Sequence, residues 1–111
     1  MTREEIENKF DISLEISDGW IPLIEPILNY ISEYNKSSLV HPIKIHQVKE
    51  KFGELRFYIS HGPMELHEMI EDAEMKSCRI CEICGELGKT RSRQGWLTTL
   101  CDKCAKNLGY D

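Results

Sequence analysis

Two Cys-x-x-Cys pairs near the C-terminus constrain the fold of this chain more than any other feature. The first pair is Cys81 and Cys84, and the second pair, Cys101 and Cys104, follows after 16 intervening residues. A two-residue gap lets one tight turn present two thiolates to the same ion, and this separation of the pairs is typical of four-cysteine zinc sites. The spacing therefore predicts one Zn²⁺ ion bound by these four residues.

A Cys-x-x-Cys pair also occurs as a redox dithiol, at the start of a helix that follows a buried strand, but two such pairs in one short chain favour metal. Cys78 competes as a ligand, yet Cys81 and Cys84 already form a tight turn that Gly85 can close, so we expect Cys78 to be a half-buried bystander. Four thiolates leave no open position for a water molecule. The zinc is therefore expected to be structural rather than catalytic.

The rest of the sequence predicts an α+β fold with a small antiparallel sheet. Alternating apolar and polar residues predict strands over 11–17, 43–50 and 54–60. Thr2 and Glu5 have the spacing of a capping box, which predicts a short first helix. Apolar residues at helical spacing predict a long helix from about Trp20, which Pro26 should kink or delay, and another helix over 63–77.

The 111 residues suffice for one compact domain, which we divide into an α+β body, residues 1–77, and a zinc ribbon, residues 78–111, docked on it. Segments 87–91 and 96–100 are the predicted arms of the ribbon hairpin. The helices should pack on one face of the sheet. The predicted core consists of Trp20, Ile24, Leu28, Phe57, Ile59, Leu66 and Ile70.

The net charge of −5 is unevenly distributed along the chain. Residues 1–75 hold 7 Lys/Arg against 15 Asp/Glu, whereas residues 76–111 hold 7 against 4. The acidic body excludes nucleic-acid binding over the whole surface and leaves only the C-terminal segment for it. The start of the sequence has no basic, apolar signal pattern, and no apolar run approaches the ~20 residues of a membrane span, so we expect a cytoplasmic protein without membrane contact.

No group of residues has the pattern of a catalytic site. The four histidines are scattered over different predicted elements, and the carboxylates between Glu65 and Glu74 are typical of a solvated helix face. We therefore expect a protein without enzymatic activity. Candidate binding residues are the polar members of the 43–60 hairpin and the basic and aromatic residues of the ribbon: Lys49, Lys51, Arg56, Tyr58, Lys89, Arg91, Arg93 and Trp96.

Several short motifs together resemble an uncharacterised family of small phage and prophage proteins. They are DGW at 18–20, QVKEKFGELRFY at 47–58, CEICGELG at 81–88 and GWLTTLCD at 95–102. In that family the last metal ligand is often His, where this chain has Cys104, and either residue completes a zinc site. The resemblance implies a phage or bacterial origin, and hence the host cytoplasm, but no mechanism.

These observations predict a zinc-binding interaction module that binds a protein partner, and the phage resemblance implies a host regulatory or defence component. The alternative is nucleic-acid binding through the ribbon. Lys89, Arg91 and Arg93 would supply positive charge for the phosphates, and Trp96 would stack on a base. We expect Trp96 instead to pack on the zinc knuckle, which favours the protein partner. The oligomeric state is left open.

Overall fold

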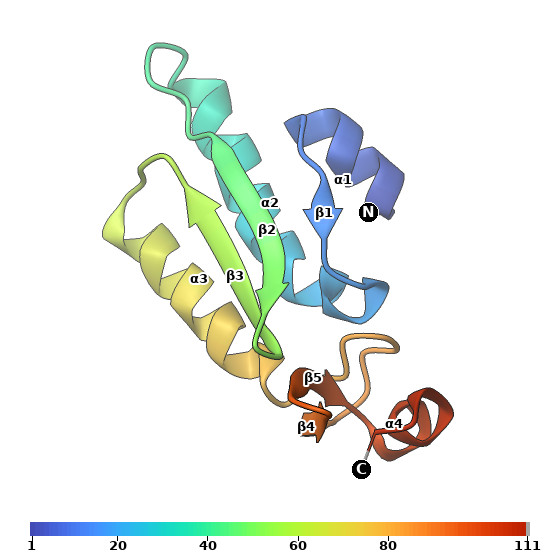
Figure 1. Cartoon of the computed structure of the whole chain (residues 1–111). Coiled ribbons are helices and arrows are strands. Elements are labelled where there is room, and N and C mark those ends of the chain that lie inside the picture. Colours follow the sequence, from blue (N-terminus) through green and yellow to red (C-terminus); the bar gives the residue numbers. More distant parts are fainter. Residues whose placement is uncertain (111) are drawn as a thin grey trace.

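The computed structural model describes residues 1–110. Within these residues, no helix has the length and apolar character that a bilayer span requires. The α+β class is confirmed (Figure 1). In chain order, the elements are α1 (Arg3–Phe10), β1 (Leu14–Glu15), the short 3-10 helix η1 (Asp18–Trp20), α2 (Ile21–Ser37), β2 (Ile45–Lys51), β3 (Glu54–Ile59), α3 (Met64–Ser77), β4 (Lys89–Arg93), β5 (Trp96–Leu100) and α4 (Asp102–Leu108).

The body contains a three-stranded sheet in the order β1-β2-β3. Strands β2 and β3 form the expected antiparallel hairpin, but β1 pairs parallel to β2, with Leu14 opposite Val48. The prediction of a wholly antiparallel sheet was therefore wrong. The long helix α2 lies between β1 and β2, and such a crossover returns the chain in its original direction. Strand β1 is also shorter than the predicted 11–17 segment, because Asp11 caps α1.

Helices α1 and α2 begin where their end signals place them. The backbone N–H of Glu5 donates to Thr2 Oγ1 at 3.2 Å and the N–H of Thr2 donates to Glu5 Oε1 at 3.0 Å, so the capping box is confirmed. Helix α2 starts at Ile21 with Pro22 in its first turn, where the N–H needs no helical partner. Pro26 lies inside the helix and does not delay its start.

The core lies between the sheet and the helices that cover one of its faces. Figure 1 shows α2 and α3 behind the sheet, with the opposite face open to the viewer. Six of the seven predicted core residues are buried, and Ile59 is half-buried against them. Since burial excludes water from one sheet face only, the residues on the other face are free to carry charge.

Side chains close both edges of the three-stranded sheet. On β3, the N–H of Leu55 donates to Ser77 Oγ and the N–H of Phe57 donates to Glu74 Oε2. Both acceptors belong to α3, and each donor–acceptor distance is 3.0 Å. On β1, the carboxylate of Glu7 accepts a backbone N–H at 2.8 Å. These side chains occupy N–H groups with which an added strand would otherwise pair.

Candidate metal centre

Three local structures bring the four predicted ligands together below the sheet (Figure 1). Cys81 and Cys84 lie on a tight turn, which the N–H of Gly85 closes by donating to the carbonyl of Cys81 at 2.9 Å. Gly85 has the expected positive φ, 85°. The hairpin of β4 and β5 then leads to Cys101, which caps the N-terminus of α4 and places Cys104 in its first turn.

The four thiols form a cluster that can hold one metal ion. Their sulfur atoms all lie within 4.8 Å of one another, and Cys84 Sγ is 3.6 Å from Cys101 Sγ. A tetrahedral zinc ion with bonds of about 2.3 Å needs sulfur atoms about 3.8 Å apart, so the donor atoms already have a suitable spacing. Within residues 1–110, this is the one group of three or more potential ligands of this kind.

The pKa values of two thiols in the cluster are shifted in opposite directions. Burial would raise the pKa of Cys81, but backbone N–H groups of Cys84, Cys101 and Ile83 stabilise its thiolate more and lower the pKa to about 7. Hydrogen bonding to Cys101 and burial raise the pKa of Cys104 to about 12. A single thiolate thus forms readily, and only a cation can relieve the repulsion among four of them.

The second cysteine pair occupies the start of a helix after a strand, as a redox dithiol would. The surroundings argue against that reading. A reactive dithiol needs an accessible thiol of low pKa, whereas the low-pKa thiol here belongs to Cys81, which is buried, and the pKa of Cys104 is raised. A metal site accounts for all four residues together.

Cys78 lies outside the cluster. Its thiol points back to α3 and contacts the carbonyl oxygen of Glu74 at 4.0 Å. Burial raises its pKa, which disfavours the thiolate that a metal needs. The half-buried position at the end of α3 matches the expectation from the sequence.

The first cysteine turn rests directly on the body. The N–H of Gly19 donates to the carbonyl of Glu82 at 2.7 Å, and the indole N–H of Trp20 donates to the carbonyl of Ile80 at 2.8 Å. The buried carboxylate of Glu82 accepts the N–H of Ser17 at 3.0 Å, and burial raises the pKa of this carboxyl. We call these contacts the clasp. They join residues 60 to 65 positions apart in the chain.

Gly19 is required for this close approach. A Cβ atom at position 19 would lie 2.2 Å from the carbonyl oxygen of Cys81 and 2.5 Å from that of Glu82. No side chain fits at such distances. The sequence drew attention to the DGW motif only through the family resemblance, and neither Gly19 nor Glu82 was among the candidate site residues. The sequence signal for this close approach was a glycine, Gly19, immediately before the predicted core residue Trp20.

The basic residues predicted as a ribbon surface are largely committed to the segment itself. Arg91 donates from Nε to the carbonyl of Leu100 at 3.0 Å and pairs with Asp102 at 2.6 Å, and its side chain is only 9% exposed. Arg93 donates to the carbonyl of Leu108 at 3.2 Å. Lys89 is exposed at the base of the hairpin. These arginines therefore brace α4 against β4 and β5.

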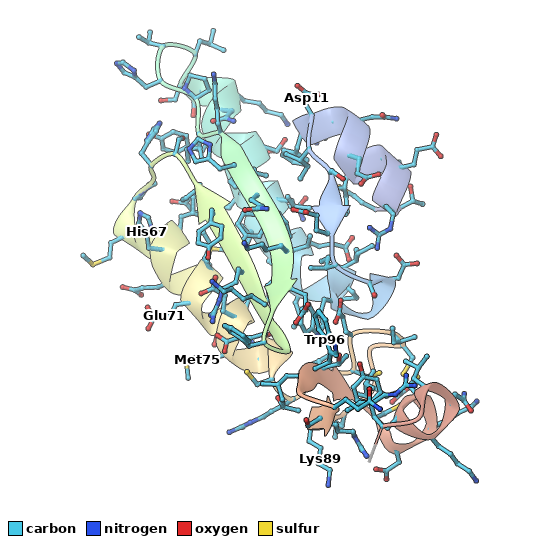
Figure 2. The ribbon with its side chains drawn as sticks, in the orientation of Figure 1. Asp11, His67, Glu71, Met75, Lys89 and Trp96 are labelled. Carbon is cyan, nitrogen blue, oxygen red and sulfur yellow. The ribbon has the colours of Figure 1, made fainter. Side chains whose placement is uncertain are left out.

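Trp96 does not pack on the cysteine turn, so that prediction was wrong. Its side chain is 77% exposed, because it lies at the first position of β5, beyond the small core of Cys81, Leu100 and Ala105. Figure 2 shows Trp96 beside the lower end of the β2–β3 hairpin.

The other candidate residues lie on β2 and β3. Lys49 Nζ lies 6.0 Å from the centre of the Tyr58 ring, and Arg56 pairs with Glu54 at 2.7 Å. Lys51 Nζ lies 5.6 Å from the ring of Phe52. These polar side chains alternate with the buried residues of the hairpin.

Comparison of the chain with protein-family models, curated proteins and solved structures finds no match. The family resemblance of the motifs therefore gains no support from these comparisons. What the structure supports is a four-cysteine cluster of the kind that binds zinc, carried by a hairpin and helix at one end of an α+β body.

Proposed function

We propose that this protein is a zinc-binding interaction module without catalytic activity, and that it binds a protein partner. Zn²⁺ held by Cys81, Cys84, Cys101 and Cys104 would have a filled coordination sphere, which supports a structural role. The resemblance to phage proteins favours a host regulatory or defence component as the partner.

The proposal of a protein partner rests on the exposure of two large aromatic side chains where the β2–β3 and β4–β5 hairpins meet. Trp96 is 77% exposed and Phe52 is 67% exposed, and both line one groove where the two hairpins meet. Aromatic residues are enriched at the energetic centres of protein interfaces, and burying them there is strongly favourable. Phe52 was not among the candidates from the sequence. An aromatic residue directly before Gly53 in a turn was the signal for it.

Nucleic-acid binding is the second candidate, and the exposure of Trp96 favours it. Base stacking on Trp96 would need nearby cations that are free to contact phosphates. Arg91 and Arg93 are engaged within the segment, which weakens this candidate.

A capture experiment separates the two candidates. Tagged protein is incubated with nuclease-treated bacterial lysate, beside a Phe52→Asn/Trp96→Thr double variant. We expect the wild type to retain a protein through a high-salt wash, because apolar contacts respond weakly to salt. The double variant should lose that protein while still carrying one zinc ion per chain. Equal capture by both chains, or capture that requires nucleic acid, would contradict the proposal.

A further inference from the structure

The turn of the β2–β3 hairpin lies against the strands of the β4–β5 hairpin, and a groove lies between the two hairpins. Thr99 Oγ1 on β5 donates to the carbonyl of Gly53 at 2.7 Å, which fixes the turn of the first hairpin against the strands of the second. The groove has a volume of about 530 Å³. It is lined by Glu50, Lys51, Phe52, Gln94, Gly95, Trp96 and Leu97.

Phe52 has a backbone conformation in the β2–β3 turn that a bulky residue rarely adopts. Its φ is 55°, in the left-handed region that Asn or Gly adopts far more readily than a bulky residue. Gly53 follows with φ of 79°, so the pair has the positive φ angles of a type I′ turn, whose preferred sequence is Asn-Gly. The ring is mostly exposed and gains little packing in return. Strain at an exposed aromatic residue points to a use outside the fold.

Trp96 supplies the second aromatic wall of the groove. Within residues 1–110, its indole N–H has no hydrogen-bond partner, whereas the indole N–H of Trp20 has one. An exposed indole combines a flat apolar surface with a free donor, a combination that suits an extended backbone carrying carbonyl groups.

The charges beside the groove favour a negatively charged ligand. Lys51 Nζ lies over the ring of Phe52 and has no ion pair in the described part of the chain. Lys49, which lies over the ring of Tyr58 and outside the lining of the groove, has none there either. The carboxylate of Glu50, which also lines the groove, accepts the N–H of Gly53 at 2.7 Å and keeps its negative charge, so Lys49, Glu50 and Lys51 together carry one net positive charge. Two cations are thus free to meet acidic groups.

From these observations we propose that the groove binds an extended, proline-containing acidic peptide of a protein partner, an inference that rests on the proposed function. Proline-rich segments form a polyproline II helix that exposes its carbonyl groups and docks between aromatic side chains. Because that helix is already extended before binding, little conformational entropy is lost on docking. Acidic residues beside the prolines would pair with Lys49 and Lys51.

Single-stranded nucleic acid fits the groove less well. It would stack on Trp96 and Phe52, but the backbone phosphates need a track of free cations. The ribbon arginines are engaged, and the chain as a whole carries a net charge of −5. An acidic peptide places fewer charges along its length and matches the two free lysines.

The test is calorimetric titration of the zinc-loaded protein with defined probes. The first probe is a peptide of four Glu-Pro-Pro repeats, and the controls are four Lys-Pro-Pro repeats, four Glu-Gly-Ser repeats and an oligo-dT of the same length. We expect the Glu-Pro-Pro peptide to bind at least about tenfold more tightly than each control, because only it has both the extended backbone and the charge. Tighter binding of oligo-dT, or no binding of the Glu-Pro-Pro peptide, would overturn the proposal.

Two variants connect the binding to the groove. Phe52→Asn replaces the aromatic ring with the residue that the turn prefers, so its thermal stability should equal or exceed that of the wild type. Its affinity for the Glu-Pro-Pro peptide, and that of Trp96→Thr, should fall at least about tenfold. A Phe52→Asn chain that binds as well as the wild type would refute the groove as the site.

The two proposals fail in different ways. If the Glu-Pro-Pro peptide does not bind but the Phe52→Asn/Trp96→Thr variant still loses the captured protein, the peptide chemistry is wrong and the interaction module stands. If capture is also unaffected by the double variant, both proposals are wrong.

Discussion

The body, residues 1–77, and the cysteine-rich segment, residues 78–110, are stabilised by different means. The body packs sixteen buried apolar residues between its sheet and helices. The segment buries Cys81, Leu100 and Ala105, and one of these three is itself a candidate ligand. A cluster that small cannot offset the conformational entropy of more than thirty ordered residues at about 1–2 kcal/mol each. We therefore expect the segment to depend on a metal ion bound by its four cysteines, whereas the body depends on its core.

The largest expected effect is that of metal removal. Structural zinc can contribute ~10 kcal/mol or more, so chelation should unfold the segment while the body keeps its helices and sheet. We expect one zinc ion per chain by elemental analysis. After chelation, amide hydrogen exchange should become fast over residues 79–105 and stay slow in α2, β2 and β3.

Two cysteine variants serve as matched controls for that result. Cys78→Ala should retain one zinc ion, because Cys78 lies outside the cluster. Cys101→Ala/Cys104→Ala should lose it. Zinc retained by the double variant would exclude the proposed ligand set, and loss of protection throughout the body would show that the two regions do not differ as described.

The two regions also differ in how far the sequence alone predicts them. In the body, periodic apolar residues predicted α3 over 63–77, and the observed helix runs from Met64 to Ser77. In the segment, ligand spacing predicted a hairpin with arms over 87–91 and 96–100; the second arm matches β5, whereas β4 lies two residues later than predicted, from Lys89 to Arg93. Patterns of this kind are local, because each follows from a repeat or a turn within a few residues.

The features that sequence reasoning missed are contacts between distant residues. Nothing near Leu14 shows that it pairs parallel to Val48, since that direction depends on where α2 returns the chain. The clasp on Gly19 and the exposure of Trp96 depend likewise on how the segment docks. The strand direction, the contacts of Gly19 and the exposure of Trp96 all depend on tertiary contacts, which cannot be inferred from local patterns in a single sequence.

Gly19→Ala tests the point where the two regions meet. The added methyl group would overlap the carbonyl oxygens of Cys81 and Glu82, so the cysteine turn must move away from the body. We expect a loss of about 1–3 kcal/mol in the free energy of unfolding, together with weaker zinc binding. Urea denaturation and competition with a chromophoric chelator measure the two quantities. Asp18→Ala, at the exposed neighbouring position, should leave zinc affinity unchanged, and an unchanged Gly19→Ala chain would disprove the clasp.

Arg91→Lys tests whether the ribbon arginine is structural. Lysine can still reach the exposed carboxylate of Asp102, but it cannot reproduce the bond from Arg91 Nε to the carbonyl of Leu100. We expect a loss of about 1 kcal/mol in the stability of the segment and no change in affinity for the Glu-Pro-Pro peptide. A selective loss of binding, measured by the same calorimetric titration, would instead place Arg91 in the interface.

The smallest expected effect is a difference in pH response between the two regions. Burial raises the pKa of Glu74 in α3 above its usual 4.5, although its carboxylate accepts the N–H of Phe57. The folded body therefore binds this proton more readily than the unfolded chain does. The contribution of Glu74 to stability is greatest at low pH, and it falls as the pH rises through 4.5 and the higher folded-state pKa. The metal centre responds in the opposite direction, because zinc needs deprotonated thiols and binds more tightly as the pH rises.

Glu74→Gln isolates the contribution of the body. Glutamine keeps an oxygen that can accept the N–H of Phe57, but it does not titrate. The wild type should therefore lose stability relative to the variant as the pH rises above 4.5, as urea denaturation at each pH would show. Taking the difference between the two chains removes the pH dependence of zinc binding, which both share. A difference that grows in the opposite direction would mean that the ionised form of Glu74 stabilises the folded state, and that its bond to the edge of β3 outweighs the desolvation of the carboxylate.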